Sequence, residues 1–170
     1  MQSNWKALAF VAAVAAVGVL AGRAFAKDEM GGAPEPEKCV DTLALVKALT
    51  GKWDVKTSIG GTGTANFHLS VGKTLLVEDY DSKGGSFGDY SGLGMFKFSD
   101  DGKTITSWWF DTYSKKPTEF TGPATDTGYE ATGGEGEHKT TIKFAKKGEG
   151  WDVSMSATGF EMTSVYTKAK

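Results

Sequence analysis

The sequence predicts an all-β protein, an antiparallel up-and-down β-barrel of about ten strands with one short N-terminal helix that caps a barrel mouth. Two observations lead to this prediction. After Gly51, apolar residues alternate with polar ones, which is the pattern of strands with one buried face. Short Gly- and Asp-rich turns separate these segments and leave no room for crossover helices, so neighbouring strands should pair antiparallel and the sheet can close.

Residues 1–26 have the three parts of a cleavable signal peptide. Lys6 supplies positive charge, residues 7–21 are apolar or small, and Ala24-Phe25-Ala26 places small residues where signal peptidase reads them. The apolar run is shorter than the ~20 residues of a membrane-spanning helix. We therefore expect an exported protein, periplasmic or secreted, that begins at Lys27 and keeps no stable membrane span after cleavage. An uncleaved anchor is the alternative.

Residues 27–38, with two glycines and two prolines, predict a flexible linker ahead of a barrel domain at residues 39–170. Cys39 is the only cysteine, so no disulfide can form within the chain. Within residues 39–50 the apolar side chains recur at intervals of three and four, which predicts a capping helix that Gly51 ends.

The strands follow the helix in sequence. We expect Gly60–Gly63 to form the first hairpin turn, Asp100-Asp101-Gly102 to form a later one, and Gly133–Glu137 to form a long hairpin tip. The expected strands are residues 53–59, 65–71, 75–80, 90–98, 104–113, 119–122, 129–132, 139–145, 151–157 and 162–167.

Four motifs occur in a fixed order between Leu43 and Lys168: Gly51-Lys52-Trp53, Val77-Glu78-Asp79-Tyr80, Tyr90-Ser91-Gly92-Leu93-Gly94 and Trp109-Phe110-Asp111. In this order they resemble the bacterial domain-of-unknown-function family 1579, a family of lipocalin-like (calycin) barrels without an assigned activity. The resemblance implies that Trp53 packs across the closed end of the barrel. Lipocalins cover this tryptophan with a terminal arginine, and here Lys168 stands in that place, where it can make a cation–π contact.

Charge and histidine content argue against two classes of function. The chain has 19 Lys and Arg against 21 Asp and Glu with no block of like charge, so we expect no nucleic-acid partner. The two histidines are His68 and His138. His68 alternates with Phe67 and Leu69 and should face solvent, and His138 follows the Gly-rich tip, so neither suits a haem ligand and we expect no cofactor.

Metal and nucleophile motifs are also weak. The segment that starts at Asp79 begins like a calcium loop, but Lys83 and Tyr90 occupy positions that should supply oxygen ligands. We therefore expect no metal, and we interpret Glu78, Asp79, Asp81 and Asp89 as a loose acidic rim. No Gly-x-Ser-x-Gly elbow occurs and no catalytic triad can be assembled, so no catalytic residue is assigned.

Aromatic residues are the most informative candidates. Trp108 and Trp109 are adjacent on one strand, so their side chains must face opposite sides of the sheet. The leading hypothesis is a barrel that binds a small apolar ligand. The expected pocket residues are Trp53, Phe67, Leu69, Tyr90, Trp109, Asp111 and Tyr166.

Two other classes of function stay open. The first is an enzyme in which a buried Asp111 with a raised pKa and neighbouring tyrosines move protons. The second is a filled barrel that acts as an envelope interaction module through an exposed Trp108 or the Gly-rich tip. A cavity would favour the ligand-binding barrel or the enzyme over the filled barrel. A buried acid with a strongly shifted pKa would favour the enzyme over the ligand-binding barrel.

Overall fold

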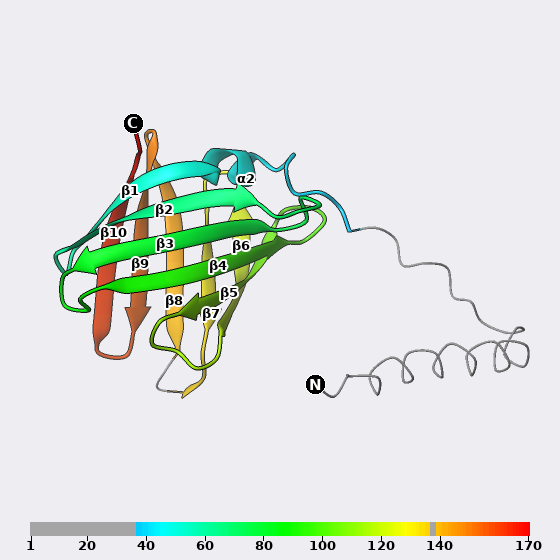
Figure 1. The fold of residues 1–170 in the computed structure, drawn as a ribbon. Coiled ribbons are helices and arrows are strands. Elements are labelled where there is room, and N and C mark those ends of the chain that lie inside the picture. Colours follow the sequence, from blue (N-terminus) through cyan, green and yellow to red (C-terminus); the bar gives the residue numbers. More distant parts are fainter. Residues whose placement is uncertain (1–36, 137–138) are drawn as a thin grey trace, which may run out of the picture. The chain divides into compact units, whose positions relative to one another are not determined.

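The structure, a computed structural model, describes residues 37–136 and 139–170 and shows one closed barrel of antiparallel strands (Figure 1). Each strand pairs with the next along the chain, and β10 pairs with β1 to close the barrel. The predicted all-β, up-and-down fold is confirmed. The predicted signal peptide, most of the linker and His138 lie outside the described residues.

Helix α2 spans Ala44–Leu49 and precedes the first strand. The strands are β1 Gly51–Thr57, β2 Gly61–Leu69, β3 Leu76–Gly84, β4 Tyr90–Phe98, β5 Thr104–Asp111, β6 Thr118–Thr125, β7 Gly128–Gly133, β8 Thr140–Lys147, β9 Gly150–Ala157 and β10 Phe160–Lys168.

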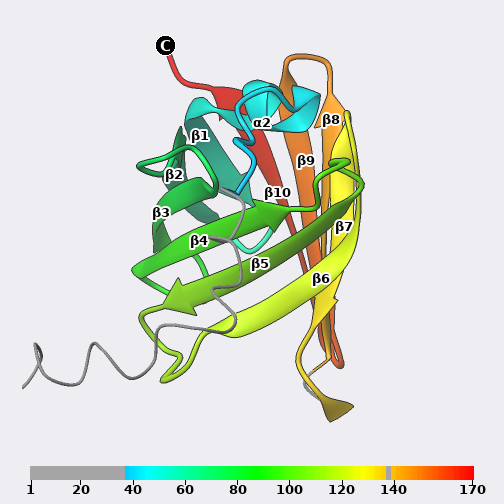
Figure 2. The ribbon, with the colours of Figure 1, turned by 90° about the vertical axis from the view of Figure 1, so that its right-hand side faces the viewer.

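The up-and-down order places alternate connections at opposite ends of the barrel. The β2–β3, β4–β5, β6–β7 and β8–β9 connections share one end with α2, which we call the helix end (Figure 2). The β1–β2, β3–β4, β5–β6, β7–β8 and β9–β10 connections lie at the other end, which we call the loop end. No helix crosses the loop end within the described residues.

The capping helix is shorter than the sequence predicts. The chain before Ala44 is not helical, and the Val40 backbone N–H donates to the Lys73 carbonyl oxygen in the β2–β3 connection at 2.8 Å. Val40 still packs in the core, and so do Leu45, Val46 and Leu49. The apolar side chains of residues 39–50 were therefore identified correctly, although only the second half of this segment is helical.

The first hairpin differs from the prediction in its register. Ser58–Gly60 forms the turn, whereas Gly61 and Gly63 belong to β2 and pair with β3. At Gly63 an added Cβ would lie 2.0 Å from the Asp81 carbonyl oxygen, so this close approach of two backbones requires glycine. β2 ends at Leu69, and Val71, which the period-two pattern placed inside, is fully exposed in the following turn.

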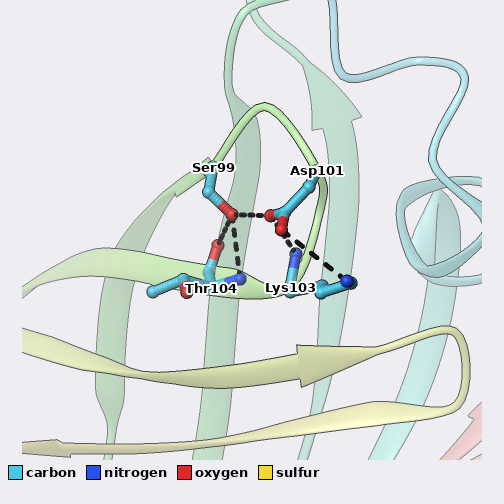
Figure 3. A network of polar contacts seen from close by, with 4 residues as sticks. All are labelled: Ser99, Asp101, Lys103 and Thr104. Carbon is cyan, nitrogen blue, oxygen red and sulfur yellow. Dashed lines mark hydrogen bonds and ion pairs between the residues drawn. The ribbon is translucent and has the colours of Figure 1, made fainter.

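The β4–β5 hairpin forms where Asp100-Asp101-Gly102 predicts it, and side-chain contacts close the turn (Figure 3). Ser99 Oγ donates to Asp101 Oδ1 at 2.7 Å and accepts the backbone N–H of Thr104 at 3.0 Å. Asp101 Oδ1 also accepts the Lys103 backbone N–H at 3.0 Å. These bonds lower the pKa of Asp101, the Ser99 hydrogen bond contributing most. They fix this turn beside α2, where Gly102 approaches the Leu43 side chain.

Trp53 lies at the helix end as the resemblance implies. Its side chain is 2% exposed, and Nε1 donates to the Leu49 carbonyl oxygen at 2.7 Å, which ties the first strand to the helix. The Lys168 ammonium lies 4.4 Å from the centre of a Trp53 ring. The predicted cation–π contact is present.

Candidate functional site

The barrel contains a cavity of about 400 Å³. Its lining extends from the loop end, where Ile59, Phe87 and Tyr113 contribute, to the middle of the barrel at Phe96 and Phe144. Apolar and aromatic side chains dominate the lining. The barrel interior is therefore filled at the helix end and hollow toward the loop end.

Glu78 is the acidic residue at the deep end of this cavity. Along β3, Gly84, Ser82, Tyr80 and Glu78 line the cavity, whereas Leu76, two residues nearer the helix end, does not. The side chain is 2% exposed. Its Oε1 accepts a hydrogen bond from the Tyr166 hydroxyl at 3.2 Å. Among the described residues, the Glu78 carboxyl group makes no other hydrogen bond.

Burial raises the pKa of the Glu78 carboxyl from 4.5 to about 8. Removal from water disfavours the charged form and is the largest cause, and the negative charge of Asp79 adds to it. The Tyr166 hydrogen bond acts in the opposite direction because it stabilises the carboxylate. Glu78 is therefore mostly a neutral carboxylic acid at pH 7.

The tyrosines around Glu78 are also affected by burial. Tyr129 on β7 and Tyr166 on β10 are buried and line the cavity, and burial raises the pKa of each hydroxyl well above its usual value. Burial also raises the pKa of Tyr80 on β3. These hydroxyls stay protonated at neutral pH and can donate hydrogen bonds into the site.

Closer to the loop end, Tyr90, Trp109 and Asp111 form a second polar group. Trp109 Nε1 donates to the Tyr90 hydroxyl oxygen at 2.6 Å, and the two rings are stacked. Asp111 Oδ1 accepts the backbone N–H groups of Tyr113 and Ser114 at 2.8 and 2.7 Å. Its carboxylate thus organises the β5–β6 connection at the edge of the cavity.

Two buried hydroxyl groups are available in the cavity wall. Ser107 on β5 is 6% exposed and Ser164 on β10 is 5% exposed, and both line the cavity. Neither side chain has a hydrogen-bond partner among the described residues. No fully buried side-chain nitrogen or oxygen among the described residues lacks a partner, so these two hydroxyl groups open into the cavity, where each can meet a polar atom of a ligand or a water molecule.

Four of the seven residues predicted for the pocket line the cavity: Tyr90, Trp109, Asp111 and Tyr166. The other three lie elsewhere. Trp53 borders a small depression at the helix end with Lys168 and Trp151, Phe67 is 1% exposed within the core, and Leu69 packs at the helix end of β2.

The buried acid of the cavity is Glu78, and the assignment of Glu78 to a loose acidic rim is wrong. Alternation along β3 already places Glu78 on the same face as Leu76 and Tyr80, and this was the signal that sequence reasoning overlooked. Asp79 and Asp81 are exposed on the outer face as expected, and Asp89 is exposed in the β3–β4 connection.

The outer wall carries the remaining polar candidates. His68 lies outside as predicted, with Nδ1 3.5 Å from Asp79 Oδ2. Trp108 faces away from Trp109, and its Nε1 donates to Glu119 Oε2 at 2.9 Å. Residues 37–136 and 139–170 contain no group of three or more His, Cys, Asp or Glu side chains arranged to hold a metal ion. In the same part of the chain, no helix has the length and apolar character needed to cross a membrane.

No protein-family model matches this chain, and no curated protein matches it. The assignment to family 1579 therefore stays a prediction.

Proposed function

We propose that this protein is an exported barrel that binds a small, largely apolar molecule in its cavity. The observation that carries the proposal is the cavity itself, about 400 Å³ in volume, with an aromatic wall and a few convergent polar groups. Ligand sites typically have about 300–1,000 Å³, a mostly apolar lining and a small number of polar groups that fix orientation. A filled interior would have argued against binding.

The polar groups favour a ligand with one polar end. Glu78, Tyr166, Ser107 and Ser164 lie in the wall of the cavity, and aromatic and aliphatic side chains make up most of the remainder. Burying the apolar part of a ligand contributes roughly 25 cal/mol for each Å² removed from water. The polar end would pair with these carboxyl and hydroxyl groups, of which Glu78 and Tyr166 already bond to each other.

A titration with the neutral apolar dye N-phenyl-1-naphthylamine tests this proposal. The dye should bind with one site per chain and gain fluorescence as it leaves water. Ser164→Phe places a ring in the cavity wall and should abolish or strongly weaken this binding. Thr163→Phe introduces the same ring at the exposed neighbouring position and should leave binding intact. Absence of saturable dye binding to the wild-type protein would contradict the proposal.

Export is the second part of the proposal, and it rests on the residue pattern of positions 1–26. N-terminal sequencing of the protein isolated from its native cells should find Lys27 first. Recovery of envelope-bound protein that begins at Met1 would support the anchor instead.

Proton transfer is a second candidate function, because Glu78 is a buried acid whose pKa of about 8 lies close to working pH. In its ionised form Glu78 could take a proton from the carbon beside a ligand carbonyl and return one. Phenylacetone in D2O is a suitable probe, since each such cycle replaces hydrogen with deuterium. Exchange should be faster with the wild-type protein than with Glu78→Gln. Equal exchange rates would exclude this activity for the probe.

A further inference from the structure

We propose that the ligand of this cavity is an apolar amine whose ammonium group pairs with Glu78. This inference rests on the proposed small-molecule binding and names the chemical class of the ligand. Three observations support it: the acidic groups of the cavity wall, the hydrogen-bond acceptors available at its deep end, and the aromatic rings that surround that end.

The charged groups in the cavity wall have one sign. Glu78 lies at the deep end and Asp111 at the end of β5 near the loops. Among the described residues, no Lys, Arg or His lines the cavity. An anionic ligand would meet these two carboxyl groups without a compensating positive charge, whereas a cation is attracted by Asp111 and by Glu78 once its carboxyl group has lost its proton.

The deep end has hydrogen-bond capacity that the chain does not use. Glu78 is 2% exposed, and its carboxyl group bonds to one partner, the Tyr166 hydroxyl. The hydroxyl groups of Ser107 and Ser164 open into the cavity from the same wall. An ammonium group has three donors and no acceptor, so it can use carboxylate and hydroxyl oxygens together.

Aromatic rings surround this end of the cavity. Tyr129 and Phe144 stack with their centres 4.8 Å apart, Phe144 meets Tyr166 at 5.6 Å, and Phe96 meets Tyr129 at 6.1 Å. All four side chains line the cavity. Ring faces carry negative electrostatic potential and attract cations, and this attraction strengthens where water is excluded. The rings therefore favour an ammonium group as well as the apolar body attached to it.

Binding of a cation should change the protonation of Glu78. The titratable groups that face Glu78 are Tyr80 on its own strand, Tyr129 on β7 and Tyr166 on β10, and all three are neutral at pH 7. Asp79 is the nearby ionised group and lies on the outer face. With a pKa of about 8, Glu78 carries about 0.9 proton at pH 7 in the empty protein, and pairing with an ammonium group releases it to the buffer.

Calorimetric titration with three probes of similar size tests the charge preference. The probes are 2-phenylethylamine, which is a cation at pH 7, 2-phenylethanol, which is neutral, and 3-phenylpropionate, which is an anion. The amine should bind the wild-type protein at least about tenfold more tightly than the alcohol, and the anion most weakly. Titrations in two buffers of different ionisation enthalpy should show about 0.9 proton released for each amine bound and none for the alcohol.

Glu78→Gln keeps the shape of the side chain and removes the carboxylate, so the ratio of amine to alcohol affinity should fall several-fold, and Asp111 and the aromatic rings account for any preference that remains. Glu161→Gln makes the same chemical change at an exposed position of β10 and should leave the ratio unchanged. Proton release is measured on the wild-type protein and is informative even if Glu78→Gln fails to fold.

Equal affinity for the three probes, or tightest binding of the anion, would overturn this inference and leave small-molecule binding intact. Amine binding without proton release would also overturn it, because Glu78 would then not be the partner. Failure of all three probes and of the apolar dye to bind would overturn the proposed function as well.

Discussion

Replacing Glu78 by glutamine should stabilise the protein, and the gain should increase with pH. The carboxyl is 2% exposed, and its pKa rises from 4.5 in the unfolded chain to about 8 in the folded protein. Below pH 4.5 the group is protonated in both states. Between pH 4.5 and 8 the unfolded chain gives up this proton while the folded protein keeps it, so folding becomes less favourable as pH rises.

The size of the effect follows from this pKa difference. Each pH unit between 4.5 and 8 lowers the free energy of unfolding by about 1.4 kcal/mol relative to a variant that does not titrate at this position. The whole interval amounts to as much as about 5 kcal/mol, which is comparable to the entire stability of many small domains. Glu78→Gln should therefore be close to the wild type in stability at pH 4.5 and clearly more stable at pH 8.

Urea unfolding followed by tryptophan fluorescence at several pH values from 4.5 to 8 measures this difference. Other groups titrate in both proteins, and their contributions cancel when the two free energies of unfolding are subtracted. Glu161→Gln, the same change at an exposed position of β10, should show no such growth. If the difference between wild type and Glu78→Gln stays constant over this pH range, the raised pKa and the argument from burial are refuted.

Three further predictions concern the barrel and its polar groups. Trp53→Ala removes a side chain that is 2% exposed and should lower the free energy of unfolding by about 3–5 kcal/mol. Lys52→Ala, on the outer face, should lower it little, and chemical denaturation measures both variants. Tyr166→Phe deletes the hydrogen bond that lowers the pKa of Glu78, so the Glu78 titration seen by carbon-13 NMR should move to higher pH; a move to lower pH would contradict the assigned role of the hydroxyl. Lys168→Gln removes the charge above the Trp53 ring and should lower the free energy of unfolding by about 0.5–1 kcal/mol. This change is measured as a shift in the urea midpoint at constant slope.

The sequence by itself determined the fold class and most of the element order. Side-chain direction alternates along every strand, so the residue pattern alone assigned Trp53, Val55 and Tyr166 to the inner face, and all three are buried. Short connections then allowed only neighbouring strands to pair. Boundaries were less certain, as the early end of β2 before Val71 shows, because a pattern of period two does not indicate where pairing stops.

The tertiary structure decided which inward polar residue forms the buried site. The sequence analysis expected Asp111 to be the buried acid and placed Glu78 in an acidic rim, and alternation along a strand carries no information on depth along the barrel. Asp111 ends its strand, where the backbone N–H groups of Tyr113 and Ser114 bind its carboxylate. Glu78 lies mid-barrel and meets Tyr166, which is 88 residues away in the chain. Only closure of the barrel through β1 and β10 brings these two residues together and excludes water from the carboxyl group, and that exclusion of water is what raises its pKa.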